Sequence, residues 1–138
     1  KYYVRFLTPK IKDLIYYNVE TKNGWTKKES FLFEIVLYPS SNQLTFKTVI
    51  SPSDPEYNCK RLEDILLEID GFSGSKGKKW LVNIIKKEKF LYDDIPSMSS
   101  EELQGIINKF FDKISPVIAK VEEKFLEHKN ELIKMKDI

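Results

Sequence analysis

The first half of the chain carries the alternation of apolar and polar positions that is typical of β-strands. Residues 2–7 and 44–50 alternate with a period of two, and residues 31–38 form a run of aromatic and branched side chains. Five residues, 39–43, separate that run from the segment that begins at Leu44, and they include proline, serine and asparagine, which favour a turn. We therefore predict a hairpin and a separate first strand.

Two later segments show the period of about 3.6 residues that is typical of helices. Asp54 and Pro55 have the character of an N-cap and a first-turn proline, and Asp70-Gly71 can end the first helix with a positive φ angle at the glycine. Apolar residues at helical spacing lie between these ends, at Tyr57, Leu62, Ile65, Leu66 and Ile69. We also expect a shorter helix around residues 11–15.

The longest helix is expected near the C-terminus. Ser99 and Glu102 have the spacing of a capping box, in which each side chain satisfies a backbone N–H group of the other residue. An apolar stripe follows in steps of three and four, at Leu103, Ile107, Phe110, Ile114, Val117 and Val121, and continues through Phe125, Leu132 and Met135. Pro116 removes the hydrogen bond to the Asp112 carbonyl, so we expect a kink or a break near Ser115.

Residues 80–85 are short, apolar and branched enough to form another strand. Together these elements predict an α+β fold, in which two main helices pack on one face of an antiparallel sheet of about four strands with a hairpin. At 138 residues the chain has the length of a single domain, residues 1–138. Its start at Lys1, without an initiator methionine, suggests a piece of a longer polypeptide.

Composition and charge narrow the class of protein without fixing its function. A hydrophobic fraction of 41% with 13% aromatic residues excludes a disordered chain, and a net charge of +2 is too small to indicate a nucleic-acid or membrane partner by itself. Cys59 is the only cysteine, which excludes an internal disulfide and fits a reducing compartment. No apolar run approaches the ~18 residues of a membrane span. We therefore expect a soluble, cytoplasmic protein without a membrane partner.

The sequence offers no complete catalytic motif. His128 is the only histidine, and it lies in a charged helical segment, where a solvated residue is the expectation. The glycine-rich segment 71–80 fails the phosphate-loop spacing, because Phe72 stands at the first glycine position and Lys79 at the serine or threonine position. Glu-x-Lys triplets, which match part of a metal-nuclease site, occur at residues 20–22, 122–124 and 127–129. Such triplets arise by chance in charged chains, so we predict no catalytic residue, metal ligand or cofactor here.

The strongest local signal is a cluster of lysines around the predicted fourth strand, formed by Lys76, Lys78, Lys79, Lys86, Lys87 and Lys89. Glu88 is the one acidic residue among them, and Trp80 and Phe90 are interleaved. Lysines that neutralise phosphates release counterions, and an exposed aromatic ring can stack on a base, so the cluster is a candidate nucleic-acid site. The alternative is that the lysines protect an edge strand from pairing with other strands, with Trp80 packed inward.

Several short segments, taken in order, resemble a known family. They are Thr8 after the first strand, Gly24-Trp25 before the hairpin, Ser51-Pro52 after it, and Lys78-Lys79-Trp80. In this order they resemble the C-terminal region of bacterial proteins of the PD-(D/E)XK nuclease superfamily, over nearly the whole chain. The sequence departs from that pattern at Tyr16-Tyr17, where a proline is expected. In such proteins the metal-binding carboxylates and lysine lie N-terminal to this region, so a divalent metal would belong to that absent part.

The resemblance implies a non-catalytic accessory domain that binds nucleic acid, such as DNA, or a partner protein. One alternative is a protein-interaction module, a homodimer formed through the helix from Leu103 to Met135 with its apolar stripe exposed beyond Pro116. A second alternative is a stand-alone metal-dependent hydrolase. That activity would need a metal or nucleotide site, which one histidine and scattered carboxylates do not assemble.

Overall fold

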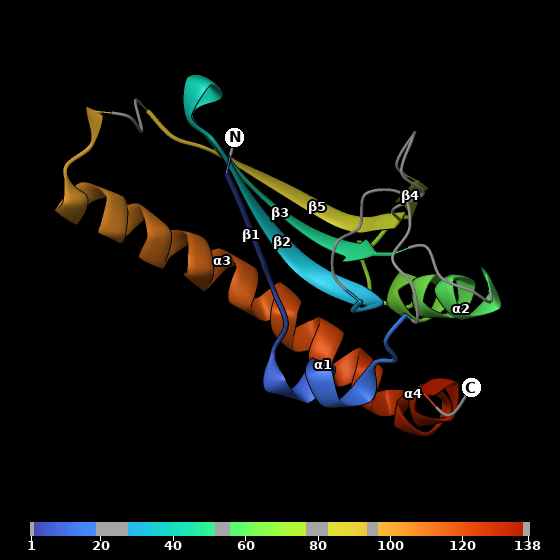
Figure 1. The fold of residues 1–138 in the computed structure, drawn as a ribbon. Helices are drawn as coiled ribbons and strands as arrows, with labels where there is room; N and C mark the ends of the chain where they lie inside the picture. Colours follow the sequence, from blue (N-terminus) through green and yellow to red (C-terminus); the bar gives the residue numbers. More distant parts are fainter. Residues whose placement is uncertain (1, 19–27, 52–55, 77–82, 94–96, 137–138) are drawn as a thin grey trace.

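The fold consists of an antiparallel sheet with a layer of helices against it, as Figure 1 shows. The computed structural model describes residues 2–18, 28–51, 56–76, 83–93 and 97–136, with the backbone alone described for residues 56–57, 75–76 and 83–90. This arrangement of strands and helices confirms the predicted α+β class.

Within the described residues the sheet has five strands in the order β1-β2-β3-β5-β4, and each neighbouring pair is antiparallel. The strands are β1 (Tyr2–Phe6), β2 (Phe31–Tyr38), β3 (Gln43–Ile50), β4 (Ser75–Lys76) and β5 (Asn83–Leu91). The expectation of about four strands was too low, because β4 is only two residues long and lies in a glycine-rich segment without alternation. The strand expected at 80–85 is β5, which extends through the lysine-rich residues to Leu91, while residues 80–82 lie outside the described part.

The predicted hairpin is formed by β2 and β3. These strands pair from Phe31 opposite Ile50 to Tyr38 opposite Gln43. The turn is a short 3-10 helix, η1 (Pro39–Ser41), followed by Asn42 with a φ angle of 52°. Asparagine tolerates this left-handed conformation better than most residues, which explains its place between the two strands.

The part of the chain that the structure describes also forms four α-helices, namely α1 (Pro9–Leu14), α2 (Glu56–Leu67), α3 (Ser100–Glu127) and α4 (Lys129–Lys136). Helix α1 confirms the short helix expected near residue 11. Helix α2 ends at Leu67, about one turn before the expected end, although Gly71 does adopt a positive φ angle of 84°. Asp54 and Pro55, the expected start of this helix, lie outside the described residues.

One hydrophobic core joins all four helices to the same face of the sheet. Phe125 of α3 packs edge-on against Phe31 of β2, with 5.2 Å between ring centroids, and Phe31 packs in the same way against Phe33. From α2 and the turn after it, the core receives the residues that the helical period predicts, Leu62, Ile65 and Leu66 on the helix and Ile69 in the turn, all of them buried. The side chain of Tyr57, the remaining member of that set, is outside the described part.

The long helix α3 runs without a break through Pro116, contrary to the expected interruption near Ser115. Pro116 and Asp112 are both exposed, so water can bind the Asp112 carbonyl that has lost its helical donor. The hydroxyl of Ser115 donates to the Phe111 carbonyl at 2.6 Å. The helix instead ends at Glu127, and His128 separates it from α4.

The start of α3 follows the predicted capping signal. Ser99 is the N-cap, and its Oγ accepts a hydrogen bond from the backbone N–H of Glu102 at 3.2 Å. The Glu102 carboxylate lies 3.1 Å from the same hydroxyl instead of reaching the backbone N–H of Ser99. The first half of the capping box is therefore present, and the reciprocal half is replaced by a contact between the two side chains.

The apolar stripe of α3 and α4 is used inside the domain. Val121, Phe125, Leu132 and Met135 are buried in the core, although the interaction hypothesis required them to be exposed beyond Pro116. The expected exposure of these residues was wrong, because the helices fold back over the sheet and cover its apolar face. None of the described helices is both long enough and apolar enough to cross a membrane.

Candidate functional site

The cross-strand register sorts the strand residues onto two faces, because side chains alternate and directly paired residues share a face. One face carries Phe31, Phe33 and Phe46 and is covered by the helices. We call the opposite side the outer face. Its positions on the four longer strands are Tyr3, Arg5, Leu32, Glu34, Val36, Tyr38, Gln43, Thr45, Lys47, Val49, Ile84, Lys87, Lys89 and Leu91.

Basic residues outnumber acidic ones among the paired positions of the outer face. A single cross-strand row contains Arg5, Glu34, Lys47 and Lys87 on four successive strands, and Lys89 follows two positions beyond Lys87. Glu34 is the one acidic residue among the paired outer positions. Its carboxylate lies 2.7 Å from Nε of Arg5 and 3.7 Å from Nζ of Lys47, so its negative charge is already shared by two cations.

In that row, Lys47 and Lys87 are directly paired residues of like charge. Like charges directly opposite each other on neighbouring strands destabilise a sheet. The residue two positions on, Lys89, pairs with Thr45, which contributes no charge. The excess of positive charge over Glu34 therefore concentrates on β3 and β5.

The structure brings together only part of the predicted lysine cluster. Lys87 and Lys89 share the outer face, whereas the register places Lys86, opposite Thr48, and Lys76, opposite Asn83, at positions of the helix-covered face. Lys78 and Lys79 lie outside the described residues. Strand alternation also places Glu88, opposite Phe46, at a position of the helix-covered face.

Two tyrosines accompany the basic residues on the outer face. Tyr3 is 45% exposed, and the guanidinium carbon of Arg5 lies 4.8 Å from the centre of its ring. Tyr38 ends β2 and is half-buried. Glu34 and Lys47 are more enclosed, with side chains 9% and 14% exposed, and Leu32, Val36 and Val49 are buried. On β1, the accessible side chains of the outer face are therefore Tyr3 and Arg5.

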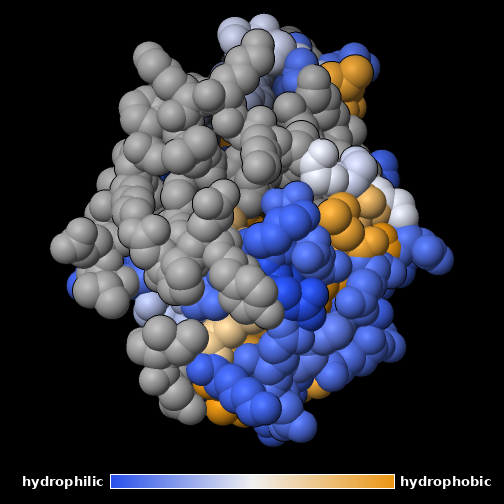
Figure 2. Space-filling model, turned by 90° about the vertical axis from the view of Figure 1, so that its right-hand side faces the viewer, coloured by the Kyte–Doolittle hydropathy of each residue, from blue (hydrophilic) through white to orange (hydrophobic). Residues whose placement is uncertain are grey.

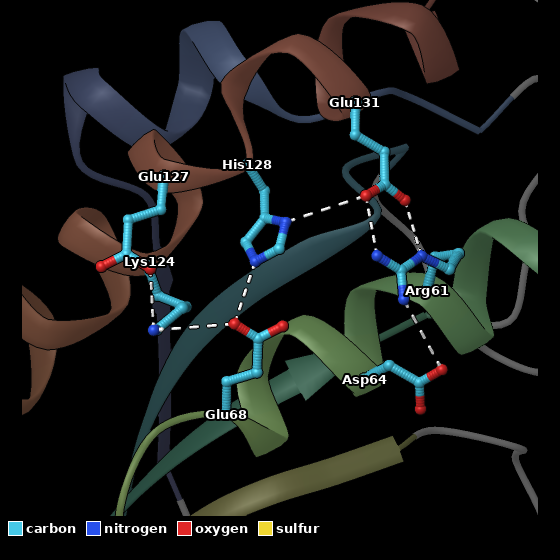
Figure 3. Close-up of polar contacts among 7 residues, drawn as sticks. All are labelled: Arg61, Asp64, Glu68, Lys124, Glu127, His128 and Glu131. Carbon is cyan, nitrogen blue, oxygen red and sulfur yellow. Dashed lines mark hydrogen bonds and ion pairs between the residues drawn. The ribbon is translucent and has the colours of Figure 1, made fainter.

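A second cluster of charged side chains joins α2 to the junction of α3 and α4, as Figure 3 shows. Arg61 makes two hydrogen bonds to Glu131, of 2.6 and 2.7 Å. His128 Nε2 lies 3.0 Å from Oε1 of Glu68, and Lys124 bridges Glu127 at 2.8 Å and Glu68 at 3.7 Å. His128 is thus a junction residue held against α2. The surface over α2 and α4 in Figure 2 is mainly hydrophilic.

The ligand atoms of Glu68, Glu127 and His128 lie within 4.8 Å of one another, a spacing that could suit a metal ion. The chemistry of the group does not fit one, because the Lys124 ammonium already lies at hydrogen-bonding distance from Glu127 and beside Glu68. A divalent cation would have to share the carboxylates with this positive charge. The residues present favour a structural connection between the helices.

Two carboxylates of this connection, Glu68 and Glu131, have pKa values below their ordinary range. The hydrogen bond from His128 lowers the pKa of Glu68, and the hydrogen bond from Arg61 lowers the pKa of Glu131. A carboxylate whose pKa is lower in the folded state stabilises the fold above its unfolded pKa, and the stabilisation is lost as the pH falls through the folded value. We therefore expect the free energy of unfolding to fall below about pH 5.

Substitution of Glu131 tests this dependence on pH. The Glu131→Gln variant should be less stable than the wild-type chain at pH 7, and the difference should be smaller at pH 3, because the stabilisation from a lowered pKa is lost as the pH falls. Urea unfolding at the two pH values measures both. Glu123→Gln, at an exposed position of α3, is the matched control. An equal effect of Glu131→Gln at both pH values would contradict the assignment.

Sequence reasoning missed Arg5, Glu34 and Lys47 on the outer face. They are far apart along the chain and only the strand order makes them neighbours, although single charged residues inside apolar strands were a signal that could have been followed.

Comparison of the chain with protein-family models, with curated proteins and with solved structures gave no match in any of the three.

Proposed function

We propose that this chain is a nucleic-acid-binding domain that contacts the phosphate backbone with the outer face of its sheet. In the setting suggested by the sequence resemblance, it is a cytoplasmic, non-catalytic accessory domain of a bacterial PD-(D/E)XK nuclease-like protein. The observation that supports the proposal most is the charge of the outer face, where Arg5, Lys47, Lys87 and Lys89 stand against Glu34.

The arrangement of these positions suits a polyanion. Lys87 and Lys89 are about 7 Å apart along β5, and Lys47 is about 5 Å from Lys87 across the strands. Lysines at neighbouring positions of one face carry like charges, so phosphate groups bound among them would lessen their mutual repulsion and release counterions. The fold should therefore gain stability when the ligand binds.

The composition of the outer face favours single-stranded over double-stranded nucleic acid. Tyr3 and the guanidinium of Arg5, already stacked on each other at the accessible side, offer a planar surface for an unpaired base. Bases in a duplex are paired and stacked, so they cannot use this surface. We expect tighter binding of single strands than of duplexes of the same sequence.

Fluorescence anisotropy with a labelled single-stranded oligonucleotide tests the proposal. The Lys87→Glu, Lys89→Glu double variant should bind at least about tenfold more weakly than the wild-type chain, which corresponds to roughly 1.4 kcal/mol. The matched control is Lys109→Glu, Lys113→Glu, which makes the same change of net charge at exposed positions of α3. Equal weakening by both variants, or no binding by the wild-type chain at low salt, would contradict the proposal.

Edge protection remains the competing explanation of these lysines. The described part of β4 pairs only with Asn83 and Ile84, so the described strands leave the rest of β5 paired with β3 alone. Glutamates protect an edge as well as lysines do, because either charge opposes edge-to-edge pairing. If protection were the only role, the Lys87→Glu, Lys89→Glu variant would keep the wild-type mass in solution and bind an oligonucleotide as the wild-type chain does.

A further inference from the structure

Among the described strands, β1 lies at one edge of the sheet. Within the described part of the sheet, β1 pairs with β2 on one side only. Its first three residues are large and exposed, with Tyr2 at 66%, Tyr3 at 45% and Val4 at 58%. The backbone N–H and C=O groups on the open side of such a strand can pair with another strand.

The two sides of the sheet differ in how strongly their residues oppose pairing with another strand. At the β5 side the strand carries Lys86, Lys87 and Lys89, which oppose pairing, whereas β1 has no lysine, proline or bulge within Tyr2–Phe6. Its one charge, on Arg5, is engaged with Glu34. An exposed, largely apolar edge strand promotes aggregation unless another strand pairs with it, so such an edge is expected where the protein has a partner.

We propose that the partner is a second copy of this chain, paired antiparallel along β1 across a two-fold axis perpendicular to the sheet. Such an axis keeps each face of the sheet on its own side. Directly opposed residues must then belong to the same face, so the axis passes through a residue and not between two residues. For the five residues of β1, the three central positions are Tyr3, Val4 and Arg5.

The sequence of β1 favours the axis at Val4. There all five residues overlap, and Tyr2 faces Phe6 of the partner subunit, Tyr3 faces the partner's Arg5, and Val4 faces the partner's Val4. These are aromatic, cation–π and β-branched pairs, which stabilise antiparallel strands. An axis at Arg5 would oppose two guanidinium groups, and an axis at Tyr3 or Arg5 would leave only three of the five residues overlapping.

The dimer would also bring the outer faces of the two copies together, although it is inferred independently of the proposed function. Because the axis is perpendicular to the sheet, both outer faces lie on the same side. Arg5 and Tyr3 of one copy then adjoin those of the other at the centre of a ten-stranded sheet. The inference itself rests on the exposure of Tyr2, Tyr3 and Val4 and on the pairing rules of strands, and it stands or falls without nucleic acid.

Sedimentation equilibrium of the full chain over a range of micromolar concentrations tests the association. The mass should rise with concentration toward twice the chain mass of 16.3 kDa. Val4→Lys, which sets two like charges on the axis, should remain at the monomer mass while keeping the wild-type circular dichroism spectrum, because Val4 is an exposed position. A wild-type chain that stays monomeric at every concentration would overturn the proposal.

The register is tested by single cysteines under oxidised glutathione. Val4→Cys places two thiols opposite each other, with Cβ atoms about 5 Å apart, so it should form a crosslinked dimer. Tyr2→Cys is the matched control, because its two copies would lie about 14 Å apart. The wild-type chain controls for the buried Cys59. Crosslinking of Tyr2→Cys as readily as of Val4→Cys would overturn the Val4 register.

Discussion

Replacement of Phe125 by alanine is expected to lower the free energy of unfolding by about 4 kcal/mol. The ring is fully buried where α3 crosses the sheet, and it packs edge-on against Phe31 at 5.2 Å. Its removal loses the transfer free energy of the ring and leaves a cavity between two rigid elements that cannot close on each other. Urea unfolding, followed by circular dichroism, measures the loss.

The control for this substitution lies on the same helix. Phe111 is 43% exposed, so Phe111→Ala removes a ring of equal size while leaving no cavity in the core. We expect a loss of less than about 1 kcal/mol from it. Similar losses from the two variants would show that Phe125 does not occupy the centre of the core, and the packing of α3 on the sheet would have to be revised.

Replacement of Glu34 by glutamine is expected to lower the free energy of unfolding by about 3 kcal/mol. Glu34 is 7% exposed and accepts from Arg5 at 2.7 Å, while the Lys47 ammonium lies 3.7 Å away with a side chain that is 14% exposed. Without the carboxylate, the enclosed lysine has no described acidic neighbour in its row and loses solvation that nothing replaces. Thermal or urea unfolding measures the effect.

The same substitution should act on binding in the opposite direction. Glu34 is the one acidic residue among the paired outer positions, so Glu34→Gln makes the outer face more positive and should tighten the binding of an oligonucleotide. Glu68→Gln, which removes an exposed carboxylate near α2, is the control for net charge and should leave binding unchanged. A Glu34→Gln chain that is folded but binds no better would speak against contact at this face.

Patterns among residues that are close in sequence predicted the hairpin, the start of α3 and the buried side of α2. The hairpin followed from the alternation in residues 44–50 and the turn residues before it, and the start of α3 followed from Ser99 and Glu102. Helix α2 followed from its apolar period, because that period alone determines which side can be buried. These features depend on neighbours within a few residues, which the sequence displays directly.

The features that were missed or wrong depend on long-range placement. The break expected near Ser115 does not occur, because Pro116 lies on an exposed side of α3 where the lost hydrogen bond can be replaced by water. The end of the helix at His128 instead accompanies a contact between Arg61 and Glu131, which are 70 residues apart. No pattern within one helix reports such a pair.

In the candidate site, too, the local pattern was visible in the sequence and the long-range placement was not. The sequence identified the lysines of β5 as a charge cluster, but it could not assign them to faces before the register with β3 was known. That register separates Lys86 from Lys87 and Lys89 and adds Lys47, which comes from another part of the chain. The site proposed from the structure therefore includes fewer of the clustered lysines than first expected, but it extends over more strands of the sheet.

The most direct measurement of the central claim is the dependence of oligonucleotide affinity on salt concentration, for the wild-type chain and for Lys87→Gln, Lys89→Gln. Each phosphate neutralised on a single strand contributes about −0.7 to the slope of log K against log salt. If the outer face is the binding surface, the slope of the variant should be shallower by about 1.4. A slope equal to that of the wild-type chain would show that these lysines contact no phosphate and would contradict the assignment of the outer face.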